Sequence, residues 1–209
     1  MPRAFSERTF TPAVIAHQER MGSARSYAKF IEGGPQQGHI IGESEKAFIE
    51  ARDGFYQATV SEIGWPYVQF RGGPPGFLKV LGPQTIGYAD FSGNRQYISR
   101  GNLDGNDRVA LILMDYANRQ RLKLLGRVSF SEGEGAAASL FPDGSDATAE
   151  RAAIIRVEAL DWNCPCHITP RYSEAELQPH LQKFGVELAQ LKAENDALKR
   201  ALAEQGTPL

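Results

Sequence analysis

The chain has 209 residues and a mass of 23.0 kDa, which suits one folded domain with an appendage and excludes two large domains. Hydrophobic residues make up 42% and charged residues 23%, values of a globular protein and not of a disordered or collagen-like chain. The net charge of -2 provides no overall positive field, so we expect no nucleic acid and no membrane among its partners.

The first part of the chain, residues 1–43, mixes polar and apolar positions without a sustained period. We interpret it as an N-terminal arm with a flexible stretch over 33–38 and a short helix near Pro12 to Gly22. A second helix is predicted to begin at a Ser44 cap, with Glu45 in its first turn, and to stop at Gly54.

From Phe55 the sequence changes to short runs of β-branched and aromatic residues separated by glycine and proline. The predicted strands cover residues 55–61, 66–71, 77–81, 85–91, 109–115, 121–130 and 154–160, with one helix over 94–103. Six or seven strands at hairpin spacing predict a mainly β fold, a small antiparallel barrel with flanking helices. Its predicted interior comprises Val60, Val68, Leu78, Ile86, Leu111, Leu113, Leu124 and Val128.

The segment that follows the last predicted strand contains both cysteines of the chain, Cys164 and Cys166. Their spacing is unsuited to an ordinary structural disulfide and agrees with a reducing compartment, so we expect a cytoplasmic protein. A tetrahedral zinc site needs four ligands, and because no second Cys/His pair exists we predict no metal. Trp162 could cover a ligand, but packing at a barrel end is the commoner role of so large a side chain.

The tail, residues 173–209, has a helical pattern with apolar residues in two interleaved seven-residue series. The series are Leu177, Phe184, Leu191 and Leu198, and Leu181, Leu188, Asn195 and Leu202. The first series forms the d positions and the second, with the polar Asn195, the a positions of a coiled-coil seam, and glutamates at g face lysines at e of a parallel partner. We therefore interpret the tail as a dimerisation helix; the alternative is an amphipathic helix folded back on its own barrel.

The stretch from Arg71 to Arg121 combines cationic residues with a predicted helix start. Lys79 lies inside an apolar strand, and Gly93 precedes the predicted helix that Asn94 opens. A helix start offers free N–H groups to an anion, and arginine and lysine supply countercharge, so this pattern predicts a phosphate cradle. The alternative is that Lys79 and Arg95 are ordinary exposed side chains.

The order of these elements resembles the FMN-binding split-barrel family typified by pyridoxamine 5'-phosphate oxidases. In that family a Leu-Leu-Lys strand and a Gly-Ser-Arg-Lys turn hold the FMN phosphate. Here the strand reads Phe-Leu-Lys over 77–79 and the turn reads Gly-Asn-Arg-Gln over 93–96, and the resemblance covers about residues 44 to 131. It implies a split barrel over 44–172 and cofactor contacts from Arg71, Phe77, Leu78, Lys79, Asp90, Asn94, Arg95, Gln96, Gln120 and Arg121.

The resemblance implies an FMN-dependent oxidoreductase that works as a homodimer, with Gln120 and Arg121 reaching the flavin of the second subunit. A small-molecule substrate and a nicotinamide electron donor are the expected reaction partners. Nothing after Leu160 resembles the family's substrate-binding Arg-Leu-His-Asp-Arg segment, so oxidation of pyridoxamine phosphate is not implied and no catalytic residue is assigned. The alternative is a non-catalytic module on the same fold that binds flavin or haem.

Overall fold

The computed structural model describes residues 2–28, 30, 38–133, 138–141, 149–162 and 164–204. Residues 33–37 of the expected flexible stretch lie outside this part of the chain. The chain divides into two compact units, Met1–Ile168 and Thr169–Leu209, each of which is taken by itself below.

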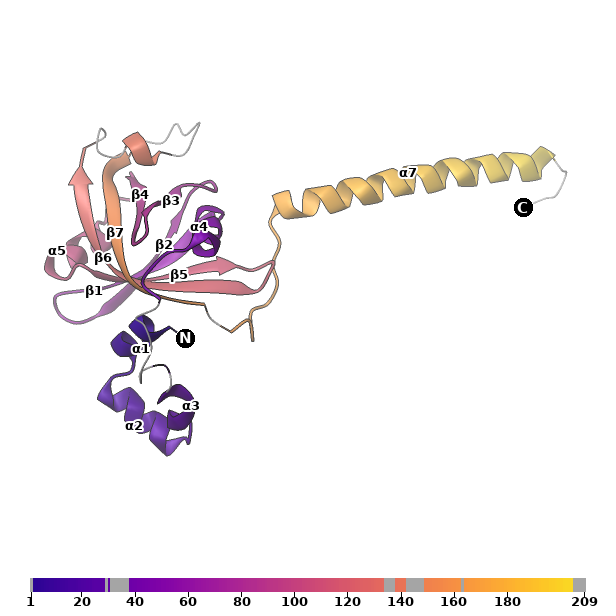
Figure 1. Ribbon diagram of the computed structural model, residues 1–209. Coiled ribbons are helices and arrows are strands. Elements are labelled where there is room, and N and C mark those ends of the chain that lie inside the picture. The colour runs from indigo at the N-terminus through magenta and orange to yellow at the C-terminus, as the bar shows by residue number, and fades with distance from the viewer. Residues whose placement is uncertain are drawn as a thin grey trace. The chain divides into compact units, whose positions relative to one another are not determined.

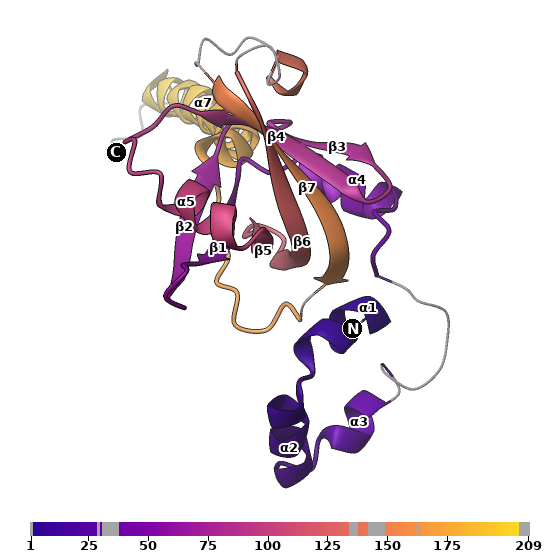
Figure 2. The same cartoon turned by 90° about the vertical axis from the view of Figure 1, so that its left-hand side faces the viewer.

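The first unit is built on one seven-stranded antiparallel sheet that curls around its core (Figures 1 and 2). Its strands are β1 (Gly54–Val60), β2 (Pro66–Gly72), β3 (Leu78–Gly82), β4 (Thr85–Phe91), β5 (Arg108–Asp115), β6 (Gln120–Glu132) and β7 (Ala149–Trp162). In the sheet they follow the order β2-β1-β5-β6-β7-β4-β3, so β2 and β3 are its edges. The predicted fold, a mainly β split barrel of six to seven antiparallel strands, is confirmed.

The two longest strands are β6 and β7, with 13 and 14 residues, and β7 begins five residues earlier than the sequence predicts. They pair over most of their length, with a register shift between Leu125 and Gly126. A side chain at Gly126 would place its Cβ only 2.5 Å from the carbonyl oxygen of Arg156, so glycine permits this close approach. This β-bulge lets the paired strands β6 and β7 bend around the core of the barrel.

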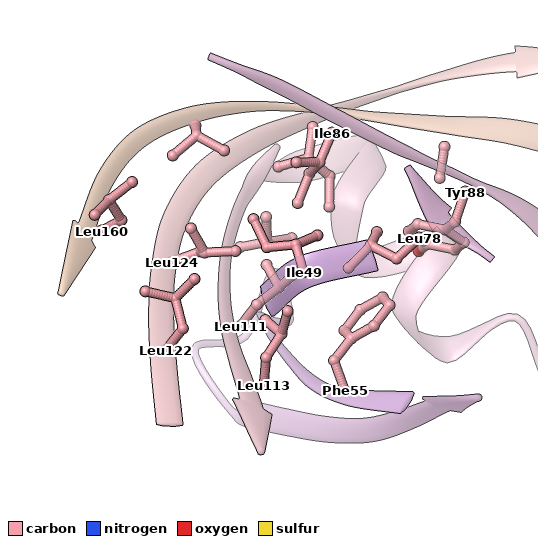
Figure 3. Close-up of a cluster of buried hydrophobic side chains, with 14 of the residues drawn as sticks. Ile49, Phe55, Leu78, Ile86, Tyr88, Leu111, Leu113, Leu122, Leu124 and Leu160 are labelled. Atoms are coloured by element: carbon pink, nitrogen blue, oxygen red, sulfur yellow. The ribbon is translucent and has the colours of Figure 1, made fainter. Parts of the chain in front are cut away.

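Apolar side chains from six of the strands fill the interior, as Figure 3 shows. Six of the eight predicted interior residues are buried there: Leu78, Ile86, Leu111, Leu113, Leu124 and Val128. The prediction is wrong for Val60, which is 39% exposed, and for Val68, which is 59% exposed. Val68 lies on edge strand β2, where alternation turns Tyr67, Gln69 and Arg71 to the opposite face.

Short helices accompany the sheet. They are α1 (Arg3–Thr9), α2 (Pro12–Arg20), α3 (Ala24–Ala28), α4 (Glu43–Glu50), α5 (Ile98–Gly105) and the 3-10 turn η1 (Ala138–Leu140). Helix α2 matches the helix predicted near Pro12. Helix α4 begins one residue before Ser44, because Gly42 is its N-cap and donates its N–H to the Glu45 carboxylate at 3.0 Å.

Trp162, at the end of β7, packs against helix α4. Its ring lies edge-on to Phe48 with centroids 4.7 Å apart, and its Nε1 donates to Glu45 Oε1 at 2.7 Å. These contacts fit the packing interpretation of Trp162, which holds α4 beside β7.

The second unit contains the 31-residue helix α7 (Glu174–Glu204). Ser173 and Glu176 cap its start reciprocally: the Glu176 N–H donates to Ser173 Oγ at 3.3 Å, and the Ser173 N–H donates to Glu176 Oε2 at 2.7 Å. None of its side chains is buried, including the apolar a and d residues. Across the described residues, no helix combines the length and apolar character needed to cross a membrane.

Candidate functional site

The candidate site begins on the inward face of edge strand β2. Because side chains of a strand alternate, Tyr67, Gln69 and Arg71 share one face, and Val68 and Phe70 share the other. All three inward residues line one cavity. The Ser99 hydroxyl of α5 donates to Gln69 Oε1 at 2.8 Å and so joins α5 to this strand.

A chain of buried charges crosses from β2 to β7. Arg71 Nη1 donates to Asp90 Oδ1 on β4 at 2.6 Å, and Arg151 Nε on β7 lies 3.4 Å from the other Asp90 oxygen. Arg151 also pairs with Glu150, which in turn accepts a bond from the Tyr97 hydroxyl at 3.2 Å. Burial raises the pKa of the Asp90 carboxyl, and the two arginines oppose that rise.

The loop that precedes α5 forms the rim of the cavity. Arg95 and Tyr97 adopt left-handed backbone conformations, with φ of 60° and 54°, and the Gln96 N–H donates to Asn94 Oδ1 at 3.2 Å. The helix itself begins at Ile98. The prediction that Asn94, Arg95 and Gln96 open the helix is therefore wrong, because these residues form a turn that ends in the left-handed Tyr97.

This cavity has a volume of about 190 Å³. It is lined by Tyr67, Gln69, Arg71, Asp90, Phe91, Gly93, Asn94, Arg95, Gln96, Tyr97, Ile98, Ser99, Arg100 and Glu150. Three of these side chains are guanidinium groups and two are carboxylates. Arg71 is paired with Asp90, and Arg100 is paired with Asp104 and Glu132, which lie outside the lining. We call this cavity the polar cavity.

The polar cavity holds donors that the protein leaves unused. The Nε groups of Arg71 and Arg100 are buried and have no hydrogen-bond partner. A buried donor without a partner costs free energy, and an anion with several acceptor oxygens is the group that would satisfy it. The residues present therefore fit a phosphate group, which arginine binds through paired N–H donors.

A second, smaller cavity adjoins the first, and we call it the aromatic cavity. It has a volume of about 160 Å³ and shares Arg71, Asp90 and Phe91 with the polar cavity. Its other lining residues are Phe70, Gly72, Phe77, Tyr88 and Ala89. Tyr88 is fully buried and donates to Gln57 at 3.1 Å, and burial raises the pKa of Tyr88 to about 12, so its phenol stays protonated.

Of the residues predicted to hold the cofactor, six lie at these two cavities. Arg71, Asp90, Asn94, Arg95 and Gln96 line the polar cavity, and Phe77 lines the aromatic cavity. Leu78 belongs instead to the buried core and lines neither cavity.

Lys79 does not reach either cavity. Its ammonium group donates to the carbonyl oxygens of Ser139 and Phe141, at 3.4 and 3.1 Å. Because its neighbour Leu78 points into the core, alternation along β3 turns Lys79 to the opposite face of the sheet. Lys79 and Arg95 therefore do not meet within one chain, contrary to the expected phosphate cradle.

Gln120 and Arg121 lie at the start of β6, beside the turn that joins it to β5. Neither lines a cavity with Arg71. This placement leaves open their expected role toward the flavin of a second subunit.

Five residues at or beside the polar cavity were not predicted from the sequence: Tyr67, Gln69, Arg100, Glu150 and Arg151. Strict alternation from Arg71 would have placed Tyr67 and Gln69 on its face. Glu150 and Arg151 stand directly before the apolar run Ala-Ala-Ile-Ile over 152–155, where charged residues are expected to be paired if buried. Among the residues that the structure describes, no group of three or more His, Cys, Asp or Glu could hold a metal ion.

Residues 41–162 match the sequence model of the family described as pyridoxamine 5'-phosphate oxidase. That range runs from just before α4 to the end of β7 and includes both cavities. No curated protein matched the chain.

Several solved structures share similarity with the chain. HupZ from Group A Streptococcus is 17% identical, with 64% of this chain and 100% of that one covered and a TM-score of 0.48. An FMN-binding protein from Syntrophomonas wolfei is 12% identical over 57% of this chain and 83% of its own, with a TM-score of 0.46. A Clostridium acetobutylicum protein of the pyridoxinephosphate oxidase family is 16% identical over 60% of this chain and 88% of its own, with a TM-score of 0.43.

Proposed function

Because the chain belongs to the pyridoxamine 5'-phosphate oxidase family through residues 41–162, we propose that it binds FMN and acts as a flavin-dependent oxidoreductase. The observation that carries the proposal is the polar cavity, where unpartnered arginine donors lie beside an aromatic cavity. When bound, the flavin supplies the electron-transfer chemistry, and the protein supplies binding and orientation.

In this proposal the polar cavity takes the phosphate. Arg71 and Arg95 supply positive charge, and Asn94 and Gln96 supply polar contacts from the rim. Asp90 keeps the Arg71 guanidinium in place through their 2.6 Å bond. Lys79 has no part in it within the same chain, because its ammonium group is committed to two backbone carbonyls.

The aromatic cavity favours the ring end of the same ligand. Phe77 and Tyr88 present aromatic surface there, and Arg71 links the two cavities. Each cavity is smaller than the roughly 300–1,000 Å³ that is typical of small-molecule sites. We propose that a second subunit completes the site and contributes Gln120 and Arg121, as the family resemblance implies.

We further propose that the homodimer is held in part by a parallel coiled coil of α7. The helix exposes its a and d residues along 31 residues, and a seam of this kind is stable only when a partner covers it. Glu187 and Glu194 at g would face Lys192 and Lys199 of the second copy. Such a protein, with its two cysteines unpaired, suits a reducing compartment such as the cytoplasm.

The direct test is FMN binding, measured by quenching of flavin fluorescence in a titration of the purified protein. The Arg71→Gln variant should bind FMN about tenfold to a hundredfold more weakly, because a charged hydrogen bond is worth about 1.5–3 kcal/mol. Arg108→Gln is the matched control, since it removes the same charge from an exposed residue outside both cavities. Equal affinity of both variants, or a wild-type protein that does not bind FMN, would contradict the proposal.

A second measurement separates an enzyme from a binding module. The FMN-loaded protein is mixed anaerobically with NADH or NADPH, and the flavin absorbance is followed. Bleaching that is faster than with free FMN supports an oxidoreductase, whereas an unchanged rate supports the alternative of a non-catalytic flavin module. The absorption spectrum of the protein as purified also tests haem, for which the described lining of both cavities offers no His, Cys or Met ligand.

A further inference from the structure

The two cysteines form an ordered pair on the surface of the first unit, apart from both cavities. Cys164 and Cys166 are exposed and unpaired. The Cys166 N–H donates to Cys164 Sγ at 3.5 Å, which holds the first sulfur against the backbone of the second cysteine. A turn at Cys166 and His167 follows directly.

The turn is anchored to the rest of the unit by the residue that follows it. Ile168 is buried, and its N–H donates to the carbonyl oxygen of Pro165 at 3.4 Å. His167 adopts a left-handed conformation with φ of 64°. Residues two apart span at most about 7 Å between Cα atoms even when extended, which is close to the 4.4–6.8 Å that a disulfide requires.

Two arginines, Arg119 and Arg121, lie near enough to the pair to act on it electrostatically. Trp162 is paired with Leu122 across β6 and β7, so the chain beyond it runs beside the β5–β6 turn that carries Arg119. Hydrogen bonds from the Cys166 thiol and amide lower the pKa of Cys164, and the charge of Arg121 adds to this. The proximity of Cys164 raises the pKa of Cys166, so the two thiols are unequal.

We propose that Cys164 and Cys166 form a reversible dithiol–disulfide exchange site for low-molecular-weight disulfides. An exposed thiol in a positive environment attacks well, and a second thiol next to it resolves the product. In the first step the Cys164 thiolate attacks one sulfur of the small disulfide, breaks its S–S bond and releases one thiolate. The Cys166 thiol then loses its proton, attacks Cys164 Sγ and releases the second thiolate, which leaves a Cys164–Cys166 disulfide and a fully reduced small molecule.

This site differs from a structural disulfide and from a metal centre. A bond between residues so close in sequence closes only a short loop and therefore adds little stability. Among the described residues, no third His, Cys, Asp or Glu joins the pair in a potential metal site. The proposal needs neither the flavin nor the dimer, so its test is independent of theirs.

The test uses the reduced full-length protein and the aromatic disulfide 5,5'-dithiobis(2-nitrobenzoic acid). The wild type should release two thionitrobenzoate anions per chain, retain no adduct and have a mass lower by two hydrogens. The Cys166→Ser variant should release one thionitrobenzoate anion per chain and keep a mixed disulfide at Cys164. Cys164→Ser should react about tenfold more slowly, because it lacks the activated thiol.

Oxidised glutathione should then give the same intramolecular disulfide in the wild type, and dithiothreitol should reverse it. A wild type that keeps an adduct on each cysteine would overturn the proposal, as would equal rates for the two serine variants. Failure of the intramolecular disulfide to form with oxidised glutathione would also overturn it. The serine variants replace exposed side chains, and an unchanged circular dichroism spectrum shows that each is folded.

Discussion

Leucine has opposite surroundings in the two units of this chain. In the barrel, Leu124 is 0% exposed and packs among side chains from other strands, whereas Leu188 in α7 is 54% exposed. Both residues stand in regular apolar patterns of the sequence. The β pattern is satisfied within one chain, because a curled sheet encloses its own interior, but the face of a lone helix needs a second surface.

This difference separates two kinds of stability. The barrel interior is stabilised by contacts within one chain, and this part of the free energy of unfolding is independent of protein concentration. Any stability that α7 gains from pairing depends on concentration, because it comes from association with another molecule. Substitutions in the two units should therefore be distinguishable by dilution.

The largest effect is expected from Leu124→Ala. Removing this fully buried side chain should lower the free energy of unfolding by about 3 kcal/mol, because transfer and cavity costs add. The measurement is urea unfolding followed by tryptophan fluorescence, since both tryptophans, Trp65 and Trp162, belong to the first unit.

Leu188→Ala is the matched control for that experiment. It should leave the barrel transition unchanged at low protein concentration, because no side chain of α7 is buried. If Leu188→Ala lowered the stability of the barrel as much as Leu124→Ala does, this would contradict the distinction between the two units.

Glu158→Gln, a substitution in β7, should have a smaller effect on the free energy of unfolding. Partial burial acts to raise the pKa of Glu158, but hydrogen bonds from Arg127 and Arg8 outweigh it and lower the pKa. A lowered folded pKa means that the pairing stabilises the barrel above the unfolded value of about 4.3 and is lost as pH falls through the folded pKa. The variant should lose about 0.5 kcal/mol at pH 7, as is typical of partly exposed pairs, and almost nothing at pH 3.

Urea unfolding at both pH values measures this difference. Glu187→Gln removes the same charge from α7 and should leave the barrel transition unchanged at either pH. A Glu158→Gln loss that is larger at pH 3 than at pH 7 would have the wrong sign for the lowered pKa.

Asn195→Leu should leave the free energy of unfolding of the barrel unchanged. It should change only the association of α7 helices. A polar residue at an a position lowers coiled-coil stability but favours the two-stranded state. Leucine should therefore strengthen helix pairing and allow oligomers larger than a dimer. Sedimentation equilibrium over a range of concentrations would detect tighter or higher-order association. An unchanged mass distribution would contradict the coiled coil.

Much of the barrel could be predicted from the sequence. Two hairpins form where glycine or proline separates runs of β-forming residues, at Gly64 and at Pro83. Strand β4 has the predicted bounds. The long helix was also predictable, because heptads and a Ser173 cap are local features. These elements depend on neighbours in sequence and need no tertiary contact to be recognised.

The site was only partly predictable, for reasons visible at two residues. Lys79 carries the right charge in a matching motif, but the side of β3 to which it points depends on Leu78 entering the core. The start of α5 was placed four residues early, because the left-handed turns at Arg95 and Tyr97 are held by tertiary contacts such as the Tyr97–Glu150 bond. The first error concerns the direction of one side chain, and the second concerns the boundary of a helix.

The sequence alone determined the strands, the heptad helix and the family resemblance, because alternation, turn residues and charge spacing act over a few neighbouring positions. The tertiary structure decided which face of each strand meets the core, and thereby brought Arg71, Asp90 and Arg151 together from three strands. Such a cluster joins residues up to eighty positions apart, and only strand pairing fixes its geometry.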